Sequence, residues 1–139
     1  MSDRIEAGRQ VVRDMLGEPF LAAMDAHAAG GGFGSAAARL ALGSAFGDVW
    51  ARPGLEKKMR SMVTMGILIA LRTPAEFKNH VRAALGNGCT VTEIEEAIIQ
   101  AIPYAGFPAV SIALSAAAEV LKERGLAGEV KTGAERGLL

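Results

Sequence analysis

Apolar residues recur every three or four positions along most of the chain, the spacing that buries one face of a helix. In the first such pattern Ile5, Val12 and Leu16 share one side, and Gly17 ends it, which predicts a helix over residues 3–16. Further helices are predicted over residues 19–27, 35–46, 56–71, 74–87, 91–102 and 106–124. β-Branched residues form few runs, so little or no sheet is expected.

Glycine and proline separate the predicted helices. Residues 28–34 hold too many glycines for a helix and are expected to form a loop. Residues 47–48 are expected to break the third helix, after which Pro53 pins an irregular segment over residues 50–55. Pro103 is expected to follow the end of a helix.

Two threonines carry signals for a helix start. Thr73 is followed by Glu76 and Thr90 by Glu93, in each case three positions later. This is the capping-box pattern, in which each side chain accepts a hydrogen bond from the other residue's backbone N–H. Capping boxes are therefore predicted at both places.

Length and charge narrow the class of protein. The 139 residues fit a single domain, residues 1–139, in which residues 126–139 are expected to be a loosely ordered tail. Fifteen basic residues balance fifteen acidic ones and are scattered, which argues against nucleic acid and anionic membranes as partners. No apolar stretch reaches the length of a membrane span. A small-molecule or protein partner is expected.

Hydropathy, cysteine and histidine add further expectations. The mean hydropathy of +0.25 is high for a small chain, which predicts that apolar helix faces are buried between subunits. Cys89 is the only cysteine, so an internal disulfide is excluded. His27 and His80 lack the spacing of metal ligands, so no metal site is expected. Without a signal sequence at its N-terminus, the protein is expected to be cytoplasmic.

Glu76 and His80 are the strongest candidates for a chemical pair. They are four residues apart on one predicted helix, so they lie near the same face and can hydrogen-bond. The carboxylate can hold the imidazole in one tautomer and raise its pKa toward neutral pH, as a general acid requires. The alternative is an ordinary surface pair with a small stabilising effect.

A series of motifs between residues 47 and 108 resembles carboxymuconolactone decarboxylases in order and spacing. The motifs are Gly47-Asp48-Val49-Trp50, Arg52-Pro53-Gly54-Leu55, Arg60-Ser61, His80, Asn87-Gly88, Glu93-Ile94 and Tyr104-Ala105-Gly106-Phe107-Pro108. The resemblance implies an all-α fold, an alkylhydroperoxidase D-like bundle of about six or seven helices, with a family core over about residues 40–125. It also implies assembly into homotrimers or homohexamers.

The same resemblance implies a lyase that removes CO2 from 4-carboxymuconolactone or a related small carboxylated lactone without a cofactor. His80 is then the expected proton donor, with Glu76 orienting it. Arg52 and Arg60 are expected to bind substrate carboxylates in a bidentate fork, with a structural salt bridge as the alternative for Arg60. Trp50 is expected either to anchor packing or to form a pocket wall. The hydroxyl of Tyr104 is a candidate donor to the developing oxyanion.

Departures from the family pattern leave other activities open. Asn79 precedes the histidine, where decarboxylases of the family tend to have leucine. Related peroxidases carry a Cys-x-x-Cys-x-x-x-His helix, and Thr73 and Glu76 stand where its cysteines would be, which argues against that route. The alternative functions are lactone hydrolysis, thiol-linked antioxidant chemistry at Cys89, and a non-enzymatic oligomeric module. Cys89 could equally be a small buried residue.

Overall fold

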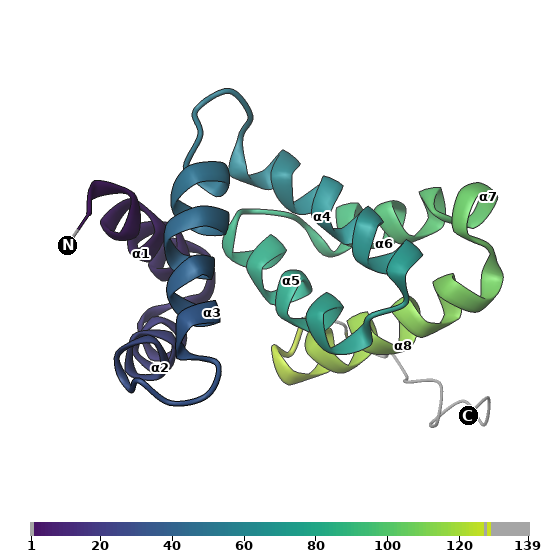
Figure 1. Cartoon of the computed structure of the whole chain (residues 1–139). Coiled ribbons are helices and arrows are strands. Elements are labelled where there is room, and N and C mark those ends of the chain that lie inside the picture. The colour runs from purple at the N-terminus through teal and green to yellow at the C-terminus, as the bar shows by residue number, and fades with distance from the viewer. Residues whose placement is uncertain (1, 127, 129–139) are drawn as a thin grey trace. The chain divides into compact units, whose positions relative to one another are not determined.

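The computed structural model describes residues 2–126 and 128, and every regular element in these residues is helical, which confirms the all-α fold (Figure 1). The elements are α1 Asp3–Leu16, α2 Glu18–Ala29, α3 Ser35–Leu40, η1 Ala41–Trp50, α4 Lys57–Leu71, α5 Pro74–Gly86, α6 Val91–Gln100, α7 Ile102–Ala105 and α8 Phe107–Glu123. The chain divides into two compact units, residues 1–57 and residues 58–139. Most of the predicted tail, residues 126–139, lies outside the described residues, and the single domain stays a prediction.

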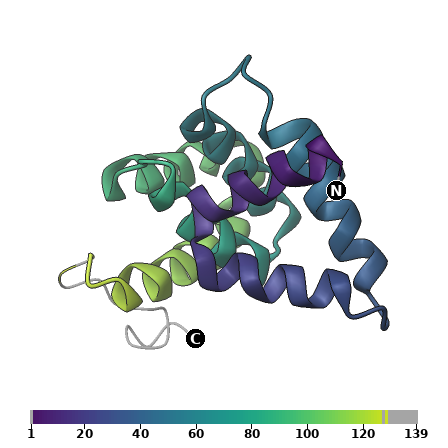
Figure 2. The same ribbon diagram turned by 90° about the vertical axis from the view of Figure 1, so that its left-hand side faces the viewer.

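The first unit consists of α1, α2 and a continuous rod in which α3 runs directly into η1 (Figure 2). Its small core is built from Val12, Leu21, Ala28 and Leu42. Helix α1 has the predicted bounds, and α2 extends the predicted helix by no more than two residues at either end. The apolar spacing of the sequence therefore located both helices.

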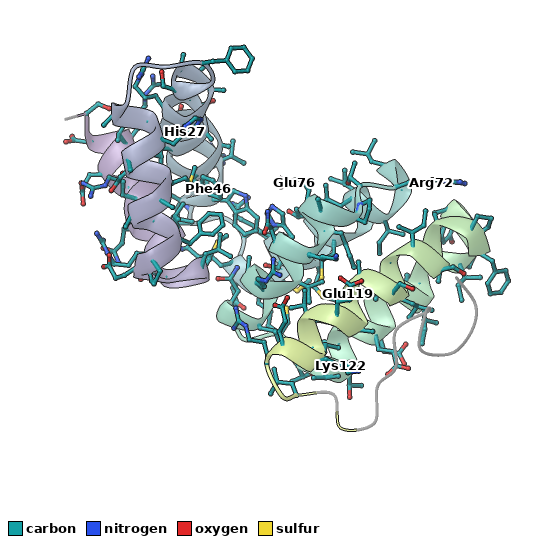
Figure 3. All side chains as sticks on the ribbon, turned by 90° about the horizontal axis from the view of Figure 1, so that it is seen from below. His27, Phe46, Arg72, Glu76, Glu119 and Lys122 are labelled. Atoms are coloured by element: carbon teal, nitrogen blue, oxygen red, sulfur yellow. The ribbon has the colours of Figure 1, made fainter. Side chains whose placement is uncertain are left out.

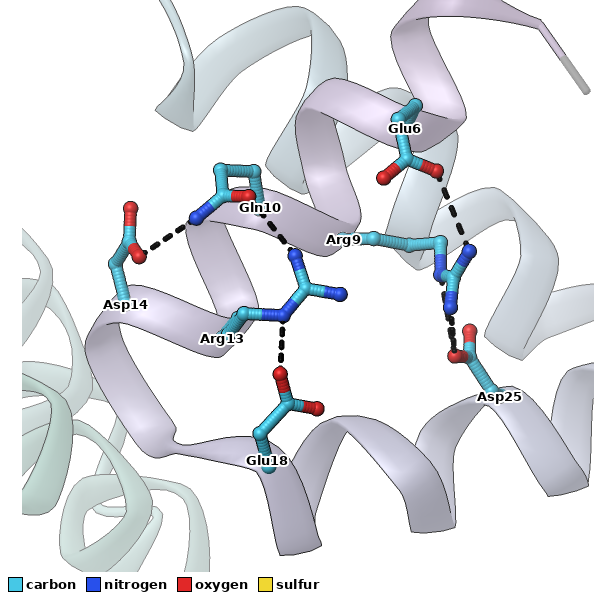
Figure 4. A network of polar contacts seen from close by, with 7 residues as sticks. All are labelled: Glu6, Arg9, Gln10, Arg13, Asp14, Glu18 and Asp25. Carbon is cyan, nitrogen blue, oxygen red and sulfur yellow. Dashed lines mark hydrogen bonds and ion pairs between the residues drawn. The ribbon is translucent and has the colours of Figure 1, made fainter.

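Polar contacts brace α1 against α2 (Figure 4). The guanidinium of Arg9 donates two hydrogen bonds to Asp25, from Nε at 3.1 Å and from Nη2 at 2.7 Å. Near the turn between the helices, Arg13 forms an ion pair with Glu18. These contacts tie α1 to α2 at two points outside the apolar core of the unit.

The third predicted helix does not break at residues 47–48, so that prediction is wrong. It continues through them as η1, which is a π-helix. A Cβ atom on Gly47 would lie 2.0 Å from the carbonyl oxygen of Arg4, and one on Gly8 would lie 1.8 Å from that of Leu42. Only glycine fits at these points, because the backbones of α1 and η1 touch where the helices cross. Gly47 therefore serves helix packing and does not end a helix.

The second unit packs α4, α5, α6 and α8 around one apolar core. The core includes Met65 and Ile69 of α4, Phe77 and Val81 of α5, Ile94 and Ile98 of α6, and Val110, Ala113, Ala117 and Val120 of α8. The alanines on α8 leave room for a neighbouring helix, and α5 and α8 share the most extensive helix contact of this unit. Helix α5, which carries Glu76 and His80, is therefore fixed by packing against α8 and the core of the unit.

One of the two predicted capping boxes is present. Thr90 accepts the backbone N–H of Glu93 at 3.0 Å, and the Glu93 carboxylate accepts that of Thr90 at 3.0 Å. Thr73 is the N-cap of α5, but its side chain makes no cap bond, so the box predicted there is wrong. Arg72, with a φ of 56°, turns the chain sharply after α4. The hydroxyl and the N–H of Thr73 both bond back to the carbonyl of Leu68, at 3.4 and 3.3 Å.

Pro103 lies inside a short helix, where the sequence predicts a helix end. Helix α6 ends before it, and the proline occupies the first turn of α7, where its missing N–H costs no hydrogen bond. Gly106, with a φ of 88°, then separates α7 from α8. Across residues 2–126 and 128, no helix is both long and apolar enough to cross a membrane.

Candidate active site

Glu76 and His80 lie on α5, which begins with proline at its first turn. Glu76 is exposed in that first turn and projects from the helix (Figure 3). His80 follows one turn later and is half-buried. The structure thus places the two residues on neighbouring positions of one helix face, as their spacing predicts.

Burial dominates the electrostatics of His80. Removal of the imidazole from water lowers its pKa below the ordinary 6.5, and the negative charge of Glu76 opposes this effect without overcoming it. Glu76 raises the pKa of His80 as expected, but burial has the larger effect, so the net shift is downward and away from neutral pH. Spacing along a helix reveals a neighbouring charge, but it does not reveal how much of the ring is buried by the rest of the fold. Burial therefore favours the neutral imidazole in the free protein.

Asn79 and Arg82 form a polar network on the same helix that the sequence did not predict. Arg82 donates from Nη1 to Oδ1 of Asn79 at 3.1 Å. Its Nη2 donates to both carboxylate oxygens of Glu123 on α8, at 3.2 and 3.1 Å. The three-residue spacing of Asn79 and Arg82 is the signal that could have suggested their contact. Nothing in the sequence indicates that Glu123 lies next to them.

Of the predicted carboxylate binders, Arg60 lies in the same unit as His80. It is half-buried on α4, and its Nε atom is shielded from solvent. Its neighbour Ser61 is fully buried and accepts a hydrogen bond from Nδ2 of Asn87 at 2.9 Å, which joins α4 to the end of α5. The first turns of α4 are therefore fixed relative to α5.

The remaining predicted site residues are distributed over both units. Trp50, the last residue of η1, is buried, and Arg52 is exposed in the segment that follows, both in the first unit. Tyr104 belongs to the second unit, where its ring is 84% exposed on α7. Helix α7 packs against α6 and α8. The participation of these three residues in one site with His80 stays a prediction.

Cys89 has the surroundings of a packing residue. Its side chain is buried, and Sγ lies 3.8 Å from the carbonyl oxygen of Lys58. Burial is the largest effect raising the pKa of the thiol, and the charge of Glu93 raises it further. A reactive cysteine needs the opposite, a low pKa and access to solvent. The environment therefore argues against thiol chemistry at Cys89.

Comparison with known proteins identifies the family. Residues 35–119 match the carboxymuconolactone decarboxylase family, and the chain belongs to it. Over 85 residues the chain is 45% identical to a 4-carboxymuconolactone decarboxylase of Acinetobacter baylyi. These residues make up 61% of this chain and 63% of that protein. Over 87 residues it is 38% identical to a nitrosuccinic acid decarboxylase of Metarhizium robertsii, covering 63% and 61% of the two chains. The chain thus spans less than two thirds of the length of these relatives.

Proposed function

We propose that this protein is a cofactor-independent lyase that decarboxylates 4-carboxymuconolactone or a related small carboxylated lactone. The identity of 45% with a protein named for that reaction is the observation that carries the proposal. The family match spans residues 35–119, which include both Glu76 and His80. The second relative is named for the decarboxylation of a different acid, which supports decarboxylation as the reaction type.

The chemistry of a carboxymuconolactone asks little of the protein. Loss of CO2 breaks a bond at the γ-carbon of the lactone, and the electron pair moves through the ring double bond to the carbonyl oxygen. A proton then joins the α-carbon. Because the substrate itself accepts the electrons, the protein has only to align the carboxylates, stabilise the oxyanion and supply one proton.

His80 is the proposed proton donor, and the substrate controls when it is charged. Burial favours the neutral imidazole in the free protein, because it lowers the pKa of the ring below its ordinary value. A substrate with two carboxylates brings negative charge next to the ring, and this raises the pKa again. Substrate binding therefore favours protonation of His80. The charge of Glu76 favours it as well, and its carboxylate orients the ring.

Substrate contacts are proposed from residue chemistry. Arg60 and Arg52 would hold the two carboxylates, because a guanidinium remains charged and binds a carboxylate through two parallel hydrogen bonds. Trp50 would form a pocket wall, and the Tyr104 hydroxyl would donate to the oxyanion. Arg60 is half-buried on α4 in the same unit as His80, and Arg52 is exposed, which supports the roles of the two arginines.

The active form is proposed to be a cytoplasmic homo-oligomer, a trimer or hexamer. The support is an apolar stripe on the second unit's helix α4, whose members follow one another at four-residue spacing and are 50–63% exposed: Met59, Val63, Ile67 and Leu71. A continuous apolar stripe of this kind is typical of a contact between subunits. Light scattering of the purified protein tests the assembly.

The enzymatic proposal is tested by following the loss of lactone absorbance with the purified protein. Wild type is compared with His80→Ala, Glu76→Gln and Cys89→Ser. We expect wild type and Cys89→Ser to be active, Glu76→Gln to be slower, and His80→Ala to lose about 10²–10⁴-fold in rate, the usual contribution of a general acid. A wild type that leaves every carboxylated lactone unchanged contradicts the function, and full activity of His80→Ala contradicts the mechanism.

A further inference from the structure

Asn79 is held in one orientation by a chain of charged contacts. Its Oδ1 accepts a hydrogen bond from Arg82 at 3.1 Å, and Arg82 is itself held by both carboxylate oxygens of Glu123 at 3.2 and 3.1 Å. An arginine can only donate, so the oxygen of the amide has to face Arg82. The nitrogen on the other branch of the amide therefore points away from Arg82.

This nitrogen carries two N–H groups that bond to none of residues 2–126 and 128. Asn79 is half-buried, lies three positions after Glu76 and directly precedes His80. The three residues span about 100° of the helix surface. A fixed donor next to the candidate proton donor is what stabilisation of an oxyanion requires.

We propose that the side-chain amide of Asn79 donates a hydrogen bond to the lactone carbonyl oxygen of the substrate as negative charge develops on it. The inference rests on the proposed decarboxylation. In that reaction the proton joins the α-carbon, which is bonded directly to the carbonyl carbon, so only two bonds separate the protonated carbon from the oxygen. A donor for the oxygen must therefore lie close to the donor of the proton, and Asn79 directly precedes His80 on α5.

The network behind Asn79 contributes to this role in two ways. The charge of Arg82 on Oδ1 polarises the amide and strengthens its N–H groups as donors. The pair with Glu123 fixes Arg82 against α8, so the amide does not need to reorient when charge appears on the substrate. Asn79 shares α5 with His80, whereas Tyr104, the other candidate donor to the oxyanion, lies on α7 with its ring 84% exposed.

Two substitutions at Asn79 test the proposal by steady-state kinetics. Asn79→Leu keeps the branched shape of the side chain and removes the donor, and we expect kcat to fall about 10- to 100-fold, the worth of a hydrogen bond to a charged oxygen. KM should change little, because the bond strengthens only in the transition state. Asn79→Asp keeps the shape and the hydrogen bond from Arg82 but has no N–H, and its kcat should fall at least as far.

Two further variants separate this role from a structural one. Lys78→Met removes the ion pair with Glu119, another contact between α5 and α8, and leaves Asn79 untouched. We expect its kcat and KM to equal those of wild type. Arg82→Leu frees the amide to rotate, and its kcat should lie between those of wild type and Asn79→Leu. Thermal unfolding of each variant verifies that it is folded at the assay temperature.

The outcomes test the role of Asn79 separately from the proposed decarboxylation. Wild-type kcat in both Asn79 variants, together with an inactive His80→Ala, overturns the role of Asn79 and leaves the decarboxylation standing. A loss of kcat in Lys78→Met equal to that in Asn79→Leu also overturns it, because the effect would then come from helix packing. A wild type inert toward carboxylated lactones overturns both.

Discussion

Glu76 lies one turn before His80 on α5, and its charge opposes the effect of burial on the pKa of the imidazole. Burial of the imidazole lowers its pKa, and the neighbouring carboxylate raises it by the smaller amount. Glu76 is exposed, so water weakens its influence on the ring. The balance between the two effects sets how both activity and stability depend on pH.

The activity of the proposed enzyme should depend on pH through His80. If the protonated imidazole is the acid, kcat/KM declines as pH rises above the pKa of the free protein, which lies below 6.5. Glu76→Gln removes the charge that raises this pKa, so we expect the decline to begin at lower pH. Initial rates between about pH 5 and 8 measure the shift. Glu96→Gln, which removes an exposed carboxylate on α6, should leave the profile unchanged, and identical profiles in all three proteins would contradict the pairing.

The free energy of unfolding should also depend on pH through His80. Its pKa is lower in the folded protein than the ordinary 6.5, so the unfolded chain binds more protons between these two values. The stability that His80 contributes is fully present above pH 6.5 and is lost as pH falls through the folded-state pKa. Urea unfolding at several pH values should show wild type losing more stability toward acid than His80→Gln does. Parallel curves would show that burial of the imidazole has no such effect.

Gly8→Ala is expected to destabilise the first unit. The added methyl group would stand 1.8 Å from the carbonyl oxygen of Leu42, an overpacking that costs about 1–3 kcal/mol or more. Gly66→Ala is the matched control, because Gly66 is also helical but has nothing within 4 Å of its Cβ position. Alanine there should stabilise α4 by about 0.5–1 kcal/mol. Denaturation followed by circular dichroism should give opposite signs for the two variants, and equal signs would refute the tight crossing.

The two helix-start threonines should differ in their contribution to stability. Thr90→Ala removes the hydroxyl that accepts the backbone N–H of Glu93 at the N-cap of α6, and we expect a loss of about 1 kcal/mol in the free energy of unfolding. Thr73→Ala removes only a hydrogen bond of 3.4 Å to Leu68, so its cost should be distinctly smaller. Urea titration of both variants compares them directly. A larger loss for Thr73→Ala would mean that its hydroxyl caps α5 after all.

Local spacing was enough to predict most of the fold. The periodicity of Val12 and Leu16 with their neighbours located α1, and the box at Thr90 located the start of α6. The continuation of η1 through Gly47 could not be predicted, because this glycine serves a crossing with α1 that no local pattern reveals. The capping box predicted at Thr73 is wrong for a similar reason. After the turn at Arg72 the hydroxyl donates back to the carbonyl of Leu68 and makes no cap bond to α5.

In the candidate site, too, local spacing predicts some features, and others depend on residues that are distant in the sequence. The proximity of Glu76 and His80 follows from their spacing on one helix. The net pKa shift of His80 depends on burial by residues brought together only in the folded unit. The orientation of Asn79 likewise depends on Glu123, which is 41 positions from Arg82 and meets it only because α8 packs on α5.

The glycine crossing of the first unit bears on the order in which the protein is built. The ribosome completes α1 long before it makes η1, whose backbone has to touch Gly8. During that interval α1 is a 14-residue helix without this partner, a length at which an isolated helix is only marginally stable in water. Helix α1 therefore completes its packing only after η1 has emerged, and until then its glycine face is uncovered in the nascent chain.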